Sequence, residues 1–277
     1  MKFPLISADI DMMVKINVYP IKFSFLNRER MNIVGLVYQG RNISRTAPTV
    51  FFADRLNADK NNGFCGIMAE RCASDSLRAV NIDFTNAFGE SDGNIHDTTV
   101  TGRVEDIEDT IKYFQGEKMM DPGCDIGIVG CGVGTVVALK LASASKYSSR
   151  IKAVVGIDAA FSLNSIFNDL VFGSMQKDVR IEERSGDIVF GNGRLDRNFM
   201  DDYYGNIRSL CETLKNSAFP TLLDLPEDNI QSYLGEDPLF MRFGSALKNF
   251  QMMKTRKTET LMKNCLQFLD RKLPKPC

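Results

Sequence analysis

The sequence predicts an α/β fold with a largely parallel central sheet, and three observations carry that prediction. Short apolar, β-branched runs alternate with helical patterns along the 277 residues. The middle runs are apolar at nearly every position, which is typical of strands covered on both faces. The first two runs, residues 15–25 and 31–40, are joined by only a short polar turn, which favours an antiparallel hairpin at a sheet edge.

The later strands and their helices follow in order. We expect the parallel strands at residues 48–53, 78–84, 125–130, 152–158 and 220–225. In the helix expected at residues 103–114, an apolar face (Val104, Ile107, Ile111, Phe114) lies opposite the acidic residues Glu105, Asp106, Glu108 and Asp109. We interpret the acidic residues as a solvated helix face rather than as a metal site. A closing helix at residues 259–272 is expected to turn Leu261, Cys265, Phe268 and Leu269 inward.

Between the sixth and seventh strands the pattern loosens. A helix at 165–176, a hairpin around Ser185 and Gly186, and a polar helical stretch at 196–216 with exposed aromatic side chains are expected there. We therefore divide the chain into a core, residues 1–160 and 216–277, and an inserted lid, residues 161–215. The lid would cover the carboxyl edge of the sheet, where open α/β sheets place their ligand sites.

Composition narrows the function classes. With 44% hydrophobic residues, 25% charged residues and a net charge of −1, nothing points to a nucleic-acid partner. No run is apolar for long enough to span a bilayer, and Asp9 and Asp11 interrupt the N-terminus where a signal peptide needs an apolar core. Seven cysteines without a CxxC pair indicate neither a disulfide framework nor a zinc ribbon. We expect a soluble intracellular, cytoplasmic protein without cofactor or metal, or an organellar one if a presequence has been removed.

Two blocks carry a resemblance to a known family. "DFTNAFGESDGNIHDTTVTGRVEDIEDTIKYF", residues 83–114, and "GIVGCGVGTVVALKLA", residues 127–142, resemble the α/β-hydrolase superfamily, most closely its small serine esterase and lipase branch with monoacylglycerol lipases and feruloyl esterases. The resemblance covers about residue 15 to 270. It implies an α/β-hydrolase fold whose nucleophile elbow is Cys131, Gly132 and Val133.

The catalytic residues that the resemblance implies are missing from their positions. The nucleophile position, the serine of G-x-S-x-G, is Gly132. The late segment that carries the family's histidine, residues 249–261, has none, and the single histidine, His96, follows the Gly-Glu-Ser block, where a surface or helix-entry role is expected. The acid position aligns with Asn229, although Asp224, Glu227 and Asp228 are near, and Ala53, Asp54 and Arg55 replace the His-Gly pair of the oxyanion loop. We therefore expect a degenerate triad and a protein that is not an enzyme.

Glycine at the apex has a physical explanation. The elbow forces its apex residue into a backbone conformation that costs about 1–3 kcal/mol for a residue with a Cβ. Glycine adopts it without the clash, so Gly132 fits a turn that is kept for packing. Gly130 and Gly134 fit the close crossing of strand and helix.

Three functions remain open. A catalytically inactive protein would act as an interaction or structural subunit of an assembly, with contact surfaces at the aromatics of residues 198–206 and at the basic segment 253–263. Alternatively, the pocket would bind a small apolar ligand with a polar head through the Val133 amide, Asp54 and Arg55, with lid residues such as Phe161, Phe167, Phe172 and Met175 around it. The third alternative is a residual esterase or thioesterase that uses Cys131.

Overall fold

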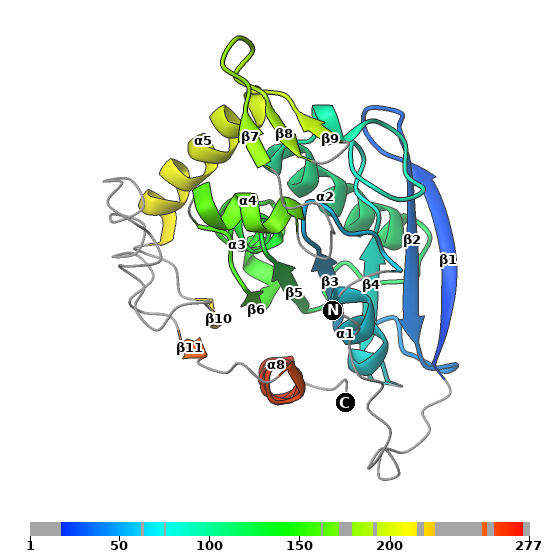
Figure 1. The fold of residues 1–277 in the computed structure, drawn as a ribbon. Helices are drawn as coiled ribbons and strands as arrows, with labels where there is room; N and C mark the ends of the chain where they lie inside the picture. The colour runs from blue at the N-terminus through cyan, green and yellow to red at the C-terminus, as the bar shows by residue number, and fades with distance from the viewer. Residues whose placement is uncertain are drawn as a thin grey trace.

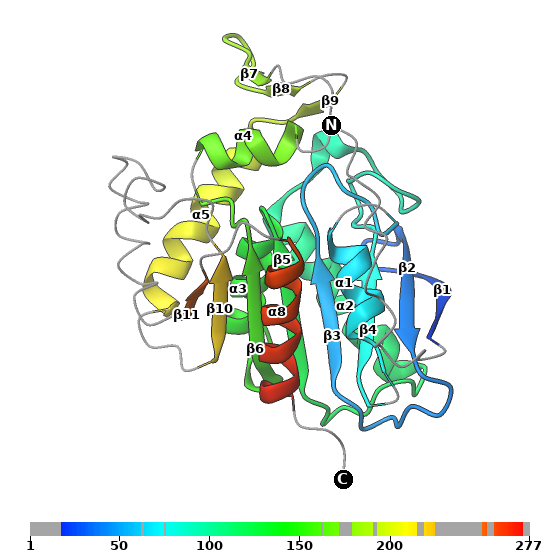
Figure 2. The same cartoon turned by 60° about the horizontal axis from the view of Figure 1, so that its bottom comes forward.

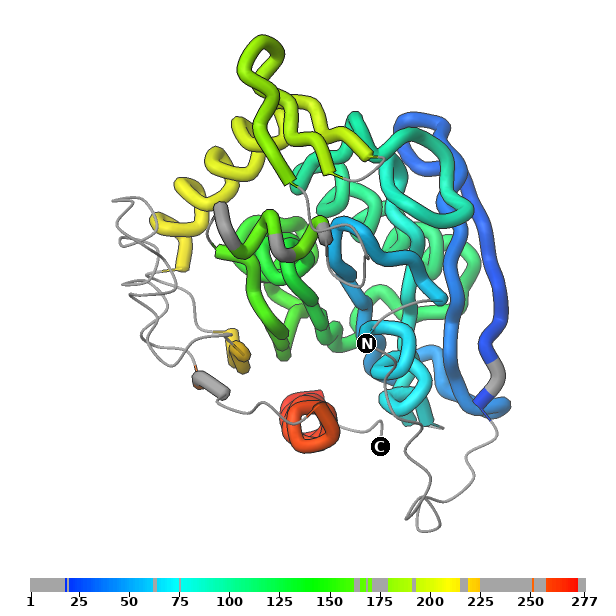
Figure 3. Tube along the Cα trace, viewed as in Figure 1, coloured from blue at the N-terminus to red at the C-terminus, as the bar shows by residue number. Residues whose placement is uncertain are grey.

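The computed structural model describes residues 18–61, 64–74, 76–161, 163–171, 179–190, 193–214, 219–224, 251–253 and 258–273 (Figure 3). Everything below concerns these residues. Several expectations lie outside them, including Phe172, Met175 and the acid-position residues Glu227, Asp228 and Asn229.

An eight-stranded sheet forms the centre of the fold, in the order β1-β2-β4-β3-β5-β6-β10-β11 (Figures 1 and 2). Its strands are β1 (Tyr19–Leu26), β2 (Asn32–Gln39), β3 (Thr49–Ala53), β4 (Arg78–Ile82), β5 (Ile126–Cys131), β6 (Ile151–Ile157), β10 (Thr221–Asp224) and β11 (Gln251–Met253). β1 pairs antiparallel with β2, and β2 with β4, whereas all other pairs in this sheet are parallel. The predicted mostly parallel sheet with an antiparallel hairpin at its edge is therefore confirmed. The edge strand β11 was not predicted.

Helices cover both faces of the sheet (Figure 2). On one face, α1 (Phe64–Cys72) and α8 (Thr258–Lys272) share a core cluster with side chains of β3 and β5. α8 buries Leu261, Cys265, Phe268 and Leu269, as its periodicity predicts. On the other face, α2 (Val100–Gly116), α3 (Gly134–Ala144) and α5 (Asn198–Thr213) form the larger cluster.

The segment expected as a lid contains α4 (Leu163–Val171) and a three-stranded antiparallel sheet of β7 (Val179–Ile181), β8 (Ile188–Phe190) and β9 (Gly193–Leu195). β7 and β8 form the hairpin predicted around Ser185 and Gly186, where Gly186 has φ of +77°. β9 was not predicted. Figure 1 shows these elements beyond one end of the central strands.

Two expectations about exposure are wrong. Asp106 on α2 is buried rather than solvated, because its carboxylate accepts hydrogen bonds from the Thr85 amide and hydroxyl and from Asn27. Phe199 and Tyr203 on α5 are also fully buried. They are four residues apart and therefore share the helix face that packs on the core, which leaves them out of any contact surface.

No helix in the described ranges combines the length and the apolarity that a membrane span requires.

Candidate functional site at the elbow

The elbow is the turn from Cys131 to Gly134 that joins β5 to α3. Gly132 has φ of +57°, the left-handed conformation expected for the apex. A Cβ on Gly134 would overlap the Ala53 backbone, and one on Gly130 would overlap the Gly134 backbone. The expected reason for these two glycines, a close crossing of β5, α3 and β3, is confirmed.

A carboxylate from α4 fills the space over the apex. A Cβ on Gly132 would collide with the Asp169 side chain, which is completely buried. Asp169 Oδ2 accepts hydrogen bonds from the backbone amides of Leu56 and Val133, both at 3.1 Å. Two amides from separate segments thus converge on one oxygen atom. We call this pair of donors the amide cradle.

Arg55 completes the surroundings of Asp169. Its Nη1 donates to Asp169 Oδ1 at 2.9 Å, and its Nη2 donates to Asp158 Oδ2 at 2.6 Å. Burial raises the pKa of the Asp169 carboxyl, while Arg55 and the two amides act in the opposite direction. Arg55 thus holds two aspartates at the position where the resemblance places the oxyanion loop.

A second carboxyl lies beyond Asp158. Asp224 ends β10, and burial together with the charge of Asp158 raises its pKa to about 6. Asp158 itself follows β6 with φ of +47°. Parallel strands end at the same edge of a sheet, so β3, β6 and β10 bring Arg55, Asp158 and Asp224 to one place.

A different cluster lies under the elbow. Cys131 is fully buried in the core cluster of α1 and α8, and its Sγ is 3.1 Å from Cys65 Sγ. Asp54 is 4% exposed. Its Oδ1 accepts from the Arg55 amide, whereas Oδ2 has no hydrogen-bond partner among the described residues. One ligand atom from each of these three residues lies within 4.8 Å of the others, a set that fits a metal ion.

The residues expected at the site divide into two groups. Cys131, Gly132 and Val133 form the elbow itself. Arg55 reaches it by binding Asp169, which also accepts from the Val133 amide, and Asp54 lies beside Cys131. Phe161 is a fully buried member of the core, and Phe167 is partly buried against the same cluster. His96 lies in a short 3₁₀ helix (Ile95–Asp97) ahead of α2 and pairs with Asp97, as expected for a helix-entry residue.

Asp169 and Cys65 were missed from the sequence. Asp169 sits in a helix of ordinary composition, 113 residues after one of its amide donors, Leu56, and 36 residues after the other, Val133. No local motif reveals such a contact. Cys65 lacks the short spacing to another cysteine that metal motifs show.

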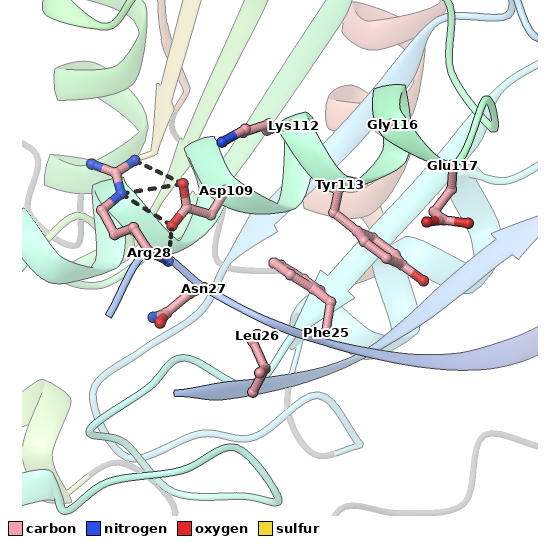
Figure 4. Close-up of a pocket in the computed structure, with 9 residues that line it drawn as sticks. All are labelled: Phe25, Leu26, Asn27, Arg28, Asp109, Lys112, Tyr113, Gly116 and Glu117. Atoms are coloured by element: carbon pink, nitrogen blue, oxygen red, sulfur yellow. Dashed lines mark hydrogen bonds and ion pairs between the residues drawn. The ribbon is translucent and has the colours of Figure 1, made fainter. Parts of the chain in front are cut away.

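A pocket on the surface, away from the elbow, is crossed by an ion pair that joins the turn after β1 to α2 (Figure 4). It lies between the end of β1 and α2, and Arg28 crosses it to bind Asp109 with its backbone amide and its guanidinium. The guanidinium also pairs with Glu105 and Glu108. One guanidinium of this chain therefore binds three carboxylates of the acidic face of α2 and offsets part of their charge.

Solved structures decide which fold this is. A structure of Est1E from Butyrivibrio proteoclasticus with ferulic acid bound is similar to this chain at a TM-score of 0.66 and 12% identity, over 90% of this chain and 98% of Est1E. The chain has the α/β-hydrolase fold. The hydrolase GrgF from Penicillium sp. sh18 (TM-score 0.61, 14% identity, 92% and 99% covered) and the Pyrococcus furiosus esterase Pf2001 (0.60, 13%, 94% and 95%) are also similar. No family model matches the chain, and no curated protein matches it.

These comparisons correct one expectation. We expected a protein that is not an enzyme, yet the similar α/β-hydrolase structures named above are esterases and a hydrolase. That expectation is therefore wrong and is withdrawn. At the elbow of this chain the amides of Leu56 and Val133 both bind Asp169.

Proposed function

We propose that this chain hydrolyses small esters at the elbow, with the amides of Leu56 and Val133 as oxyanion donors. The observation that carries the proposal is the convergence of both amides on one oxygen at 3.1 Å. Acyl-transfer sites place their donors at about this distance, roughly 2.7–3.1 Å, from the oxygen that becomes negative. The carboxylate of Asp169 resembles the carboxylate product of ester hydrolysis, so the described arrangement corresponds to a product-like state.

In the proposed reaction the carbonyl oxygen of the substrate takes the place of Asp169 Oδ2 in the amide cradle. Asp169 stays paired with Arg55 and accepts a proton from a water molecule, whose oxygen bonds to the carbonyl carbon. The carbonyl electron pair moves onto the oxygen in the cradle. When it returns, the ester C–O bond breaks, and Asp169 gives the proton to the departing alkoxide. Ester and water are thus converted to acid and alcohol.

The proposed step uses no serine–histidine pair. Gly132 brings no side chain to the apex, and His96 is 37% exposed beside Asp97. A carboxylate is the titratable group that contacts the amide cradle in the described structure, and its burial, which raises its pKa, favours proton acceptance.

Ester hydrolysis by the purified chain tests this proposal. The panel contains p-nitrophenyl acetate, p-nitrophenyl butyrate and methyl ferulate, the last chosen because the Est1E structure holds ferulic acid. Asp169→Asn keeps the side-chain shape but cannot accept the proton, so we expect it to lower kcat by about 100-fold or more. The matched control is Asp187→Asn, a buried aspartate of the three-stranded sheet region that pairs with Arg194.

Three results contradict the proposal. The first is a wild-type protein that hydrolyses none of the three esters above the buffer rate. The second is hydrolysis that survives in Asp169→Asn. The third is hydrolysis that disappears in Cys131→Ala while Asp169→Asn stays active, because it would make the Cys131 thiol the nucleophile.

A second candidate function is binding of a carboxylate-bearing apolar molecule. It is favoured by the occupant of the amide cradle, which is itself a carboxylate paired with Arg55. Isothermal titration of the wild-type protein with ferulate and octanoate tests it. Heat of binding that is lost in Arg55→Gln supports it, and no heat with either compound contradicts it.

A role in a protein assembly stays a prediction. The buried aromatics of α5 no longer support it, and three of the four basic residues of segment 253–263 lie outside the described residues. Size-exclusion chromatography and pull-down from the native source test it.

A further inference from the structure

The cluster under the elbow joins three parts of the chain. Asp54 follows β3, Cys65 lies in the first turn of α1, and Cys131 ends β5. All three side chains are buried, at 4%, 0% and 0% exposure. Cys131 is 66 residues from Cys65 in the sequence, and the fold brings the ligand atoms of all three residues within 4.8 Å of one another.

One oxygen atom of this cluster makes no hydrogen bond of good geometry among the described residues, although the Cys65 thiol lies beside its carboxylate. Asp54 Oδ2 is buried without a hydrogen-bond partner among the described residues, although Oδ1 of the same carboxylate accepts from the Arg55 amide. Buried polar atoms are nearly always paired, so an unpaired carboxylate oxygen beside two thiols indicates a missing partner. A cation is the partner that satisfies a carboxylate oxygen and two sulfur atoms together.

We propose that Asp54 Oδ2, Cys65 Sγ and Cys131 Sγ form a binding site for Zn²⁺. Two thiolates and one carboxylate match the ligand preference of zinc, which is softer than that of Mg²⁺ or Ca²⁺. Tetrahedral zinc with Zn–S bonds of about 2.3 Å separates two sulfur atoms by about 3.8 Å. The sulfur atoms are 3.1 Å apart here, so a shift of about 0.7 Å, well within side-chain reach, accommodates the ion.

Exchange of the two thiol protons for one Zn²⁺ leaves the charge of the cluster unchanged. Zn²⁺ enters and the two thiol protons leave, so the cluster keeps its net charge of −1 beside Arg55. Burial raises the pKa of the free Cys65 thiol, so it is coordination to the ion that displaces the thiol proton. Three protein ligands leave the fourth position of the tetrahedron for another ligand.

A bound ion would also hold in place the two segments that form the amide cradle. Leu56 lies two residues after Asp54, and Val133 lies two residues after Cys131. One ion would thus tie together both segments that supply the cradle donors. The inference does not depend on ester hydrolysis, because the ligands are different residues from those of the proposed reaction.

Metal analysis of the full-length chain tests the inference. After growth with zinc and dialysis against a weak chelator, we expect one Zn²⁺ per chain by plasma mass spectrometry. Cys65→Ala and Cys131→Ala should lose the ion, and Asp54→Asn should weaken binding by about tenfold or more. Cys72→Ala, a buried cysteine on the same helix, is the control that should keep it.

A second measurement needs no variant. Wild-type protein stripped of zinc and loaded with Co²⁺ should show the intense near-ultraviolet band of thiolate-to-cobalt charge transfer. The inference is wrong if wild-type protein holds neither zinc nor this cobalt band. It is also wrong if Cys72→Ala loses as much metal as Cys65→Ala, or if intact-mass measurement shows Cys65 and Cys131 joined in a disulfide.

Discussion

Replacing Asp169 by alanine removes the group that ties α4 to the elbow. The substitution deletes three hydrogen bonds at once and leaves the amides of Leu56 and Val133 unpaired in a buried space. It also leaves Arg55, which is 8% exposed, with Asp158 as its remaining carboxylate partner among the ion pairs of the described residues. Breaking a buried ion pair by removing one partner costs about 3–5 kcal/mol.

The matched control is Asp158→Ala. Asp158 pairs with the same arginine but is 38% exposed, so its ion pair is partly screened by solvent and worth about 0–1 kcal/mol. Urea titration followed by circular dichroism measures both variants. We expect Asp169→Ala to lose about 3–5 kcal/mol of unfolding free energy, which corresponds to a fall in Tm of roughly 5–9 °C for a chain of 277 residues.

Formate and acetate add a test that stability alone does not provide. Asp169→Ala leaves a carboxylate-sized space next to Arg55 and the amide cradle, so either anion should raise the Tm of this variant more than that of wild-type protein or of Asp158→Ala. The reasoning fails if Asp169→Ala loses less than about 1 kcal/mol, the range of an exposed pair. It fails equally if the anions stabilise all three proteins alike, because such an effect comes from general solution conditions.

Three further predictions concern stability. Gly132→Ala should lower the free energy of unfolding by about 2 kcal/mol or more, because φ is positive at this position and the new Cβ meets Asp169. Gly205→Ala, where α5 leaves open space, should raise it by about 0.5–1 kcal/mol. Thermal unfolding compares the two variants. Asp106→Ala should lower the free energy of unfolding in urea by about 1–3 kcal/mol, because it leaves the Thr85 donors unpaired. Glu105 is more exposed, so Glu105→Ala should change the same quantity by under about 0.5 kcal/mol. The folded pKa of Asp224, about 6, lies above its unfolded value. Its contribution to the free energy of unfolding is therefore fully present below the unfolded pKa, at about pH 4, and is lost as the pH rises to about 6. Asp224→Asn should flatten this part of the pH profile of stability measured in urea.

The sheet was predictable because its strands carry their own signal. Residues 126–131 and 151–157 are almost wholly buried, so hydrophobicity alone marks them. β9 and β11 have three residues each, too few to show a pattern. The burial of Phe199 and Tyr203 was within reach, since their spacing continues through Ile207 as one apolar helix face.

The amide cradle was only half predictable. The glycines and the Val133 amide follow from the local conformation of the elbow turn, which the sequence block specifies. Asp169 does not, because a carboxylate on a helix is exposed by default and only the folded arrangement places it over Gly132. The same holds for Cys65 and Cys131, whose proximity depends on how α1 packs beside β5.

The arrangement at the elbow explains why a glycine apex and a buried aspartate occur together. Any side chain at position 132 would occupy the space that the Asp169 carboxylate fills, so the two positions are sterically coupled. The carboxylate in turn requires the arginine at position 55, since an unpaired buried charge would be too costly. Arg55, Gly132 and Asp169 therefore form one unit. A single Gly132→Ser change, which restores the hydroxyl at the apex, should displace Asp169 and destabilise the fold before it adds a nucleophile. Only a double change, Gly132→Ser with Asp169→Ala, would make room for the hydroxyl, and a Tm above that of Gly132→Ser alone would reveal the coupling.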